Sequence, residues 1–331
     1  MSNTELWKYS TSRQEEEMLL SLRLLGDCDW SDARQLACLY ALSNETDKHY
    51  YSCTLYKRDG GQRRLLVPDA LLKRVQRNIL HQVLDKLPYS PYATAYHPGA
   101  GIRQNALQHV GQKRLLKLDI KQFFDHIDLA MVYRWAFPAV YFPPAVRGLL
   151  SHLCCYRNHL PQGAPTSPAI SNLVLKSFDE QLGAWCQTQG ISYSRYCDDL
   201  AFSGDFAVQA VKRQVKQLLS VRGFALNPAK TQTASEGQQQ KVCGVVVNEK
   251  PQVERSYRRR LRQILYYGRR YGLEEHLRHT GDAAYLQEGR AYVGRYARHL
   301  LGQVNFVLQI DPTDQEFQEA AQWLKTVIAA E

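Results

Sequence analysis

The sequence predicts a mixed α/β fold of the α+β kind, in which acidic residues stand at the ends of strands. Residues 191–204 read ISYSRYCDDLAFSG, so two strand-like runs flank Asp198-Asp199 and predict a hairpin. Upstream, the apolar run in KRLLKLD ends at Asp119 and predicts another acidic strand. Between them, residues 160–175 form a turn rich in Gly and Pro that leads into an apolar helix.

The adjacent carboxylates of Asp198 and Asp199 indicate a cation site. Like charges at a tight turn repel each other, and a hard divalent ion such as Mg²⁺ prefers carboxylate oxygens. The alternative is a solvated Asp-Asp turn, because Asp is a common turn residue. Asp119 favours the cation site, since this third carboxylate ends an apolar strand instead of lying on a polar face.

The composition favours a nucleic-acid partner. The 331 residues are 44% hydrophobic, enough for a large core, and the net charge of +10 points to a polyanion. A basic surface without such a partner is the alternative. The eight cysteines include no CxxC pair, and no Cys/His set has zinc spacing. With no signal peptide and no long apolar run, we expect a reduced, cytoplasmic protein without a membrane partner.

The N-terminal part predicts helices followed by a basic hairpin. Residues 1–45 have apolar residues at roughly helical spacing, and HYYSCTLYKRDGGQRRLLVP alternates like two strands joined at Asp59-Gly60-Gly61. Arg63 and Arg64 follow this turn, either as phosphate ligands or as a solvated strand face. A helix should then run from about Asp69 to Leu87 with one apolar stripe.

The middle of the chain predicts a Gly-rich loop and several helices. Residues 92–112 should form the loop and a short helix that carries Asn105 and His109 four apart on one face, although a capping pair would look the same. Residues 129–156 should be helical with proline breaks. Ser167-Pro168 should start a long helix that continues to about Trp185.

The last part of the chain predicts a hairpin and an arginine-rich helical region. KVCGVVVNEK, residues 241–250, reads as a hairpin strand with a Gly where a backbone comes close. Residues 256–272 place six arginines on a helix with few offsetting acids, which suits a phosphate backbone. The stretch 283–306 and a final acidic one near 313–329 should also be helical.

Three motifs in this order resemble the palm of a reverse transcriptase: Asp119 after its strand, PQGAPTSP, and Tyr-Cys-Asp-Asp in its hairpin. The resemblance covers about residues 63–307. NALQH, which contains Asn105 and His109, is similar to the Asn-Ala-x-x-His element of retron reverse transcriptases. The departure is Val242-Cys243-Gly244, where those enzymes typically carry Val-Thr-Gly.

The resemblance implies a right-hand polymerase with fingers, a ferredoxin-like palm sheet and a helical thumb. The implied domains are N-terminal helices and fingers at 1–112, a palm at 113–250 and an arginine-rich thumb at 251–331. A helical fingers insertion should occupy about 129–160.

The resemblance also implies roles for individual residues. Asp119, Asp198 and Asp199 would be catalytic and, with the main-chain carbonyl of Ile120, would hold two Mg²⁺ ions, with Mn²⁺ as a substitute. The dNTP would meet Arg63, Arg64, Phe124, Gln162 and Lys230. Phe124 would exclude the ribose 2′-hydroxyl, unless it and Phe123 both belong to the core, and Lys230 would protonate pyrophosphate, unless it is a solvated loop lysine. RNA or primer contacts would come from Asn105, His109, Val242, Cys243, Gly244, Arg258, Arg259, Arg262 and Arg269.

The implied function is that of a bacterial retron reverse transcriptase. Such an enzyme binds its own structured noncoding RNA, primes from an RNA 2′-hydroxyl and makes branched msDNA, commonly in antiphage defence with a separate effector protein. One alternative is a group II intron-like reverse transcriptase. We expect this less, because the chain ends soon after the expected thumb and leaves no room for a maturase or endonuclease domain. Another is a catalytically silent RNA-binding scaffold. A nucleotidyltransferase or cyclase on a related sheet would need neither the arginine-rich region nor the PQGAPTSP loop.

Overall fold

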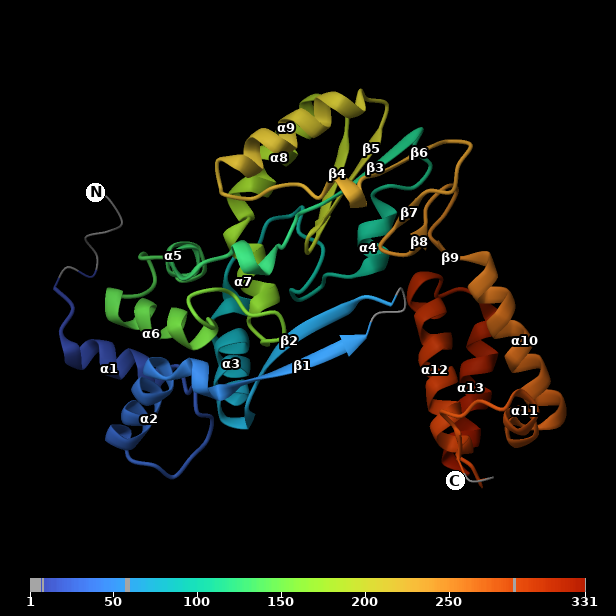
Figure 1. The fold of residues 1–331 in the computed structure, drawn as a ribbon, viewed down its shortest axis with the longest axis horizontal. Helices are drawn as coiled ribbons and strands as arrows, with labels where there is room; N and C mark the ends of the chain where they lie inside the picture. The colour runs from blue at the N-terminus through green and yellow to red at the C-terminus, as the bar shows by residue number, and fades with distance from the viewer. Residues whose placement is uncertain (1–6, 8, 57–59, 288–289, 331) are drawn as a thin grey trace. The chain divides into compact units, whose positions relative to one another are not determined.

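The chain divides into two compact units in this computed structural model, which describes residue 7 and residues 9–56, 60–287 and 290–330 (Figure 1). The first unit comprises residues 1–100, 116–202 and 206–232, and the second comprises 101–115, 203–205 and 233–331. Both units are therefore built from segments that are distant in sequence. None of the described helices is long and apolar enough to cross a membrane.

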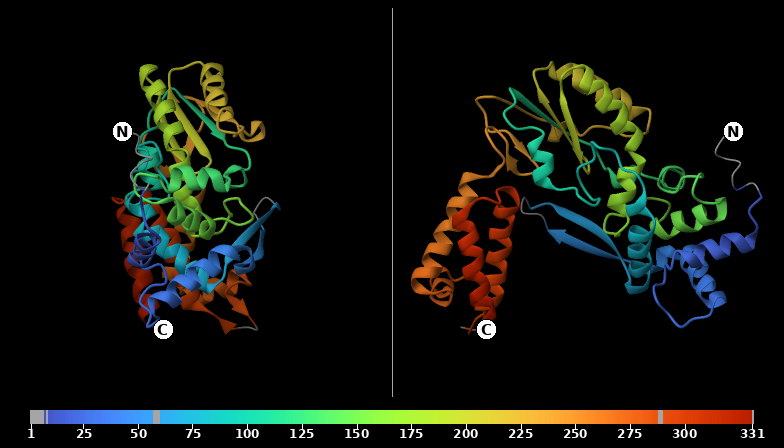
Figure 2. Two further views of the ribbon diagram at one scale, coloured as in Figure 1. Left: turned by 90° about the vertical axis from the view of Figure 1, so that its left-hand side faces the viewer. Right: turned by 180° about the vertical axis from the view of Figure 1, so that it is seen from behind.

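A four-stranded sheet carries the acidic residues. Cross-strand aromatic packing supports it, since the rings of Tyr193 and Phe202 stack with centroids 5.0 Å apart. Two helices, α8 and α9, lie side by side over this sheet (Figures 1 and 2). The strands run in the order β4 (Ser192–Tyr196), β5 (Asp199–Gly204), β3 (Arg114–Asp119) and β6 (Gln232–Ser235).

The helices of the first unit bury apolar faces in one shared core. In α3, Leu72, Val75 and Ile79 are fully buried, as the predicted stripe requires, and Asp69 caps the helix by accepting from the backbone N–H of Leu72 at 2.9 Å. The helices are α1 (Ser12–Ser21), α2 (Asp32–Asn44), α3 (Ala70–Gln82), α5 (Leu129–Met131), α6 (Pro144–Cys154), α7 (Ser167–Val174), α8 (Lys176–Thr188) and α9 (Val208–Ser220). Short helical turns are η2 (Thr46–His49), η3 (Leu84–Lys86), η4 (Phe124–His126), the π-helical η5 (Val132–Ala136) and η6 (Pro228–Lys230).

The predicted N-terminal hairpin is present as β1 (Tyr50–Tyr56) and β2 (Gln62–Pro68). The antiparallel register pairs Leu55 with Arg63 and Thr54 with Arg64. Of the predicted turn, Asp59 lies outside the described residues. The hairpin places both arginines near the end of β2 that adjoins the turn.

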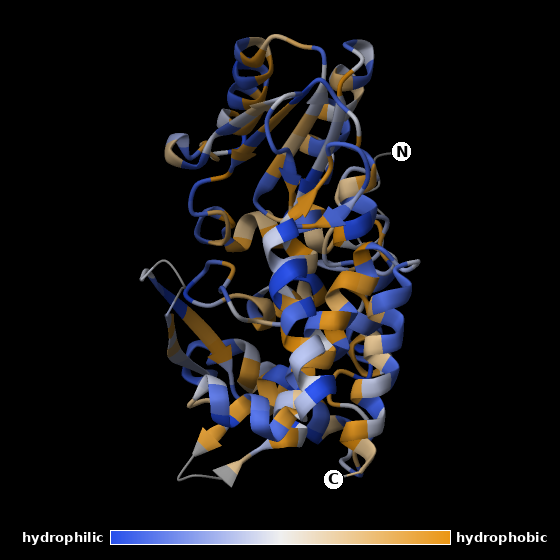
Figure 3. Ribbon diagram, turned by 90° about the vertical axis from the view of Figure 1, so that its right-hand side faces the viewer, coloured by the Kyte–Doolittle hydropathy of each residue, from blue (hydrophilic) through white to orange (hydrophobic). Residues whose placement is uncertain are grey.

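The second unit combines a small sheet with a set of helices. Its strands β7 (Lys241–Val242), β8 (Val245–Val246) and β9 (Gln252–Val253) pair in this order, and α4 (Ile102–Leu107) packs against them. The helices carry both hydrophilic and hydrophobic residues along their length (Figure 3). They are α10 (Arg255–Tyr271), α11 (Leu273–Thr280), α12 (Val293–Ile310) and α13 (Gln315–Ala329), and β10 (Leu286–Gln287) pairs with β11 (Arg290–Ala291).

Three predictions of local structure are wrong. The helix predicted from about Asp69 to Leu87 ends at Gln82, and η3 follows it as a separate turn. The single helix predicted from Ser167 to about Trp185 is two helices joined at Leu175, although the Leu175 N–H still donates to the Ser171 carbonyl at 3.2 Å. The start of the stretch 283–306 is a hairpin instead of a helix. Gly281, with φ of 62°, ends α11, and the Asp282 carboxylate accepts from the Ala284 N–H at 3.0 Å, which begins a turn.

Candidate active site

The backbone brings Asp119 and Asp198 together from separate parts of the chain. Asp119 is the last residue of β3, and Asp198 lies in the two-residue turn between β4 and β5. The N–H of Ile120 donates to the carbonyl oxygen of Asp198 at 3.0 Å. The end of β3 is therefore hydrogen-bonded directly to the turn of the acidic hairpin.

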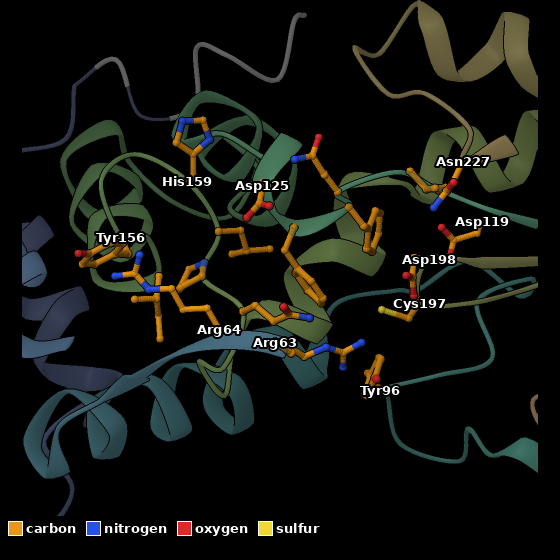
Figure 4. Close-up of a pocket in the computed structure, with 18 of the residues that line it drawn as sticks. Arg63, Arg64, Tyr96, Asp119, Asp125, Tyr156, His159, Cys197, Asp198 and Asn227 are labelled. Carbon is orange, nitrogen blue, oxygen red and sulfur yellow. The ribbon is translucent and has the colours of Figure 1, made fainter. Parts of the chain in front are cut away.

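These residues open onto a pocket of about 820 Å³ in the first unit (Figure 4). Its lining includes both acids and every residue that the sequence assigned to the dNTP. Residues that lie more than 160 positions apart in the chain, from Arg63 to Lys230, thus line one cavity. The predicted residues that line it are Arg63, Arg64, Asp119, Ile120, Phe124, Gln162, Asp198 and Lys230.

The two arginines of β2 lie on different sides of this pocket. Arg63 lies on the side of Tyr96 and Asp198, whereas Arg64 lies on the side of Tyr156 (Figure 4). The Nε of Arg64 also donates to the Ser52 hydroxyl at 2.8 Å. Arg63 is thus the arginine nearer to the acids, a distinction that the sequence left open.

The Gln-Gly loop is docked against the same strand. The N–H of Leu66 donates to the carbonyl of Gln162 at 2.9 Å. Gly163 has φ of +133°, and a Cβ at this position would stand 2.5 Å from the Leu66 carbonyl oxygen. Only glycine fits this approach, which holds Gln162 beside the strand that carries Arg63.

Phe123 and Phe124 both line the pocket but differ in burial. Phe123 is 4% exposed and belongs to the core, while Phe124 is half-buried and packs against that core. Their ring centroids are 5.4 Å apart. Phe124 therefore presents its ring to the pocket from a rigid base.

Asp119 is held by the segment that follows α9. Lys230 Nζ lies 2.6 Å from Asp119 Oδ2, and the Asn227 N–H donates to the Asp119 carbonyl at 2.8 Å. The hydrogen bond to Asp119 raises the pKa of Lys230, and the charges of Asp119, Asp198 and Asp199 raise it further against the opposing effect of burial. Lys230 is thus an ion-pair partner of Asp119, although its side chain is 58% exposed to solvent.

Asp199 occupies a different position from the other two acids. It is the first residue of β5 and does not line the pocket. Burial raises the pKa of its carboxyl, and the charge of Asp198 raises it further, while Lys117 lowers it. Within the described part of the chain, no group of three or more His, Cys, Asp or Glu side chains is arranged to hold a metal ion. A site formed by all three carboxylates therefore stays a prediction.

A strained backbone marks pocket residues that the sequence did not reveal. Tyr96, Gln122, Arg157 and Cys197 all line the pocket and have positive φ, between 47° and 59°. Left-handed conformations cost non-glycine residues roughly 1–3 kcal/mol and tend to gather at functional sites. Except for Cys197, which adjoins the acidic pair, no motif pointed to these residues.

In the second unit, the predicted pair Asn105 and His109 is buried. His109 Nδ1 lies 2.7 Å from the Ser203 hydroxyl, and burial lowers the pKa of His109 to about 4. Asn105 Nδ2 donates to Cys243 Sγ at 3.2 Å. The helix ends at Leu107, so His109 follows it instead of sharing its face. The two residues tie α4 to β5 and to the β7–β8 turn, and the burial disfavours their predicted direct contact with RNA.

The turn Val242-Cys243-Gly244 joins β7 to β8. Val242 is buried, and Cys243 and Gly244 have φ of 48° and 81°. A Cβ on Gly244 would meet no atom within 4 Å. Within the described residues no other part of the protein comes close to Gly244, so the turn conformation explains the glycine, and an approach by the primer stays a prediction.

Several arginines of α10 are paired inside the second unit. Arg258 contacts Asp314, Arg262 Nε lies 2.6 Å from Glu316 Oε2, and the guanidinium of Arg269 lies 5.4 Å from the Trp323 ring centroid. The prediction that few acids offset these arginines is wrong for Arg258 and Arg262, because the N-cap and first turn of α13 supply the acids. Arg259 is exposed, and none of the ion pairs among the described residues involves it.

Comparisons with known proteins agree with this geometry. A family model described as reverse transcriptase (RNA-dependent DNA polymerase) matches residues 55–254. The retron Mx65 reverse transcriptase of Myxococcus xanthus is 36% identical over 264 residues, 73% of this chain and 62% of that protein. The retron Mx162 reverse transcriptase of the same organism is 34% identical over 237 residues, 62% of this chain and 48% of that protein. The retron Ec86 reverse transcriptase of Escherichia coli is 30% identical over 227 residues, 67% of this chain and 71% of that protein.

The chain thus spans less than two thirds of the length of the two Myxococcus relatives. The match to the family model nevertheless covers the sheet, the pocket and the β7–β9 strands, and it confirms the α/β polymerase fold that the motifs implied. From the family model and the relatives together, the chain belongs to the retron-type reverse transcriptases.

Proposed function

We propose that this chain is an RNA-directed DNA polymerase of retron type that extends a primer with dNTPs. The observation that carries the proposal is the single pocket in which Asp119 and Asp198 meet Arg63, Phe124 and Gln162. Carboxylates at the end of β3 and in the β4–β5 turn can bind the metal ions that assist phosphoryl transfer. The guanidinium of an arginine can bind two oxygens of a triphosphate.

Two Mg²⁺ ions, for which Mn²⁺ would substitute, would be held by Asp119, Asp198, Asp199 and the main-chain carbonyl of Ile120. The residues fit such ions because burial and the neighbouring charge of Asp198 already raise the pKa of Asp199, and a cation would relieve this repulsion. The ions would lower the pKa of the primer hydroxyl and neutralise charge on the leaving pyrophosphate.

The remaining residues of the pocket would select and orient the substrate. Arg63, nearer to the acids, and Arg64 would contact the triphosphate, and Gln162 would lie by the sugar and base. The Phe124 ring would exclude the ribose 2′-hydroxyl. Lys230, whose pKa is raised, would stay protonated at neutral pH and donate a proton to pyrophosphate.

The template would be a structured noncoding RNA of the retron, and a 2′-hydroxyl of that RNA would serve as primer. The product would be msDNA joined to RNA, and a separate effector protein would complete an antiphage defence system in the bacterial cytoplasm. This part of the proposal rests on the similar proteins, which are named as retron reverse transcriptases. The net charge of +10 supports the binding of a nucleic acid.

The test is to purify the protein from its host and to sequence the nucleic acid that accompanies it. A single short DNA joined to one discrete RNA, absent from Asp198→Asn, is the expected result. Asp128→Asn is the matched control, because Asp128 lies outside the pocket lining, caps α5 by accepting from the Met131 N–H at 2.8 Å, and Asn caps equally well.

Other outcomes select the alternatives. A mixed pool of RNA without attached DNA, together with primer extension on a supplied template, would indicate a reverse transcriptase of the group II intron kind. The same pool without any primer extension would indicate an RNA-binding scaffold. DNA synthesis by Asp198→Asn would overturn the assignment of the acids.

A further inference from the structure

A second cavity lies wholly within the second unit, between α10, α11 and the start of α12. Its volume is about 870 Å³. From α10 it is lined by Arg260, Tyr267 and Tyr271, which the spacing of seven and four places on one helical face. The neighbouring face of α10, with Leu261 and Leu265, is buried instead. The face of α10 that lines the groove is therefore different from the face that is buried.

Aromatic rings form two stacked pairs in the groove. Tyr267 and Tyr271 stack with centroids 6.2 Å apart and an interplanar angle of 21°, and His276 and Tyr296 stack at 6.2 Å and 24°. Arg270 Nε donates to the Tyr271 hydroxyl at 3.2 Å, which steadies a ring that is 60% exposed. Tyr296 is only 6% exposed, whereas Tyr267 and Tyr271 are 40% and 60% exposed. These two rings therefore form a platform on which another flat ring can stack.

The charged side chains of the groove are one cation and two acids. Arg260, Glu275 and Asp282 line it, and within the described part of the chain no ion pair involves any of them. Two carboxylates accept hydrogen bonds and cannot donate them, whereas the guanidinium attracts phosphate. The groove thus offers a ligand three kinds of contact: rings for stacking, carboxylates that accept hydrogen bonds from the donors of a base, and a guanidinium for a phosphate.

We propose that this groove binds one unpaired guanosine nucleotide of the RNA. The base stacks on Tyr271, its N1–H and N2–H₂ donors meet the carboxylate of Glu275 or Asp282, and its phosphate lies toward Arg260. Guanine is the RNA base that offers two adjacent donors on its pairing edge. An arginine side chain of a partner protein would also suit rings and acids, but Arg260 would repel it, and the chain's net charge of +10 favours a polyanion.

The identity of this RNA ligand rests on the proposed function. The experiment uses the purified full-length protein and 6-thioguanosine 5′-monophosphate, which keeps both donors and cross-links on irradiation, with 4-thiouridine 5′-monophosphate as the comparison. Peptides are mapped by mass spectrometry. Cross-links within residues 260–296, several-fold stronger for the thioguanosine, are expected, whereas nucleotide bound at the polymerase pocket labels different peptides.

Matched variants separate the groove from the general surface. Tyr271→Ala should reduce cross-linking in the groove about tenfold, since one base–aromatic stack contributes this order of binding. Glu275→Gln together with Asp282→Asn should remove the preference for thioguanosine and keep stacking. Glu274→Gln, an exposed neighbour that does not line the groove, should behave as wild type.

Three results would overturn the inference: equal labelling by both nucleotides, labelling that survives Tyr271→Ala, or labelling that an arginine-rich peptide abolishes and unlabelled GMP does not. The last result would assign the groove to a protein partner. The cross-link does not require DNA synthesis, so a failure here and a failure of the proposed polymerase activity are distinguishable.

Discussion

The buried guanidinium of Arg195 donates through Nη1 to the carbonyl oxygen of Cys197 at 3.0 Å. Cys197 has φ of 59° and directly precedes Asp198, so this bond holds the strained turn that presents the proposed catalytic carboxylate. Asp179 fixes the guanidinium from the other side with bonds of 2.8 and 2.6 Å, and Asn172 accepts a further bond at 3.0 Å. All three side chains are fully buried. The position of Asp198 thus depends on an ion pair beneath it.

We expect Arg195→Met to lower stability by about 3–5 kcal/mol, because it leaves the Asp179 charge buried without its partner. The double variant Arg195→Met, Asp179→Leu should recover much of that stability but not the anchor of the turn. In the double variant kcat for DNA synthesis should fall while KM for dNTP changes little. Urea unfolding and steady-state kinetics measure both quantities. Wild-type kcat in the double variant would show that the pair serves stability alone.

Gly163→Ala should destabilise the first unit by about 1–3 kcal/mol, because the new Cβ meets the Leu66 carbonyl oxygen at 2.5 Å. The same clash should push Gln162 away from β2 and raise KM for dNTP. Gly148→Ala is the control, since it lies inside α6 with no atom within 4 Å of a new Cβ. It should be neutral or stabilise by up to about 1 kcal/mol. Equal stability of the two variants would contradict the docking of the loop.

Phe124→Ala should admit ribonucleotides, because the half-buried ring at the pocket wall would no longer exclude the 2′-hydroxyl. The measurement is the ratio of kcat/KM for dNTP and rNTP. Phe123→Ala should cost about 3–5 kcal/mol of stability, since Phe123 is 4% exposed, and should change that ratio less than Phe124→Ala does. An unchanged ratio in Phe124→Ala would show that Phe124 serves as a core residue and does not select the sugar.

Lys230→Ala should lower kcat by roughly 10²–10⁴-fold, the usual contribution of a general acid. Stability should change by less than about 1 kcal/mol, because the lysine side chain is 58% exposed. Pre-steady-state incorporation of one dNTP separates the chemical step from substrate binding. A loss of dNTP affinity without a slower chemical step would leave Lys230 as a binding residue.

Asp199→Asn should raise the unfolding midpoint at pH 7. Burial and the charge of Asp198 raise the pKa of Asp199 above 3.8, so its ionised form is less favourable in the folded than in the unfolded chain. The destabilisation is therefore greatest above the raised pKa and disappears as the pH falls toward 3.8. Unfolding midpoints between pH 8 and 4.5 should converge. A midpoint lowered at pH 7 would contradict the repulsion.

Asp205→Asn provides the control of opposite sign. A hydrogen bond from Lys113 lowers the pKa of Asp205, so its ionised form adds stability above its ordinary pKa that is lost at lower pH. Because this pair is exposed, its variant should show only a slight loss at neutral pH.

The acidic motifs were predictable because local spacing sets them. Asp119 ends an apolar run, and the alternating residues around Asp198 and Asp199 describe a hairpin whatever surrounds them. The pocket residues Tyr96 and Gln122 were not predictable, since their positive φ is imposed by packing and no residue type announces it. The hairpin at residues 286–291 was missed because its strands are only two residues long.

By itself, the sequence determined the polymerase family, the order of the acidic strands along the chain and the loop rich in Gly and Pro between them, since each depends on residues close together in the chain. Tertiary structure decided which groups meet across long separations. It buried Phe123 in the core behind the half-buried Phe124, placed Lys230 on Asp119, and paired Arg258 and Arg262 with acids at the start of α13. These contacts depend on how the whole chain packs. The free energy of a buried charge or ring depends on its neighbours, and residues distant in sequence provide them.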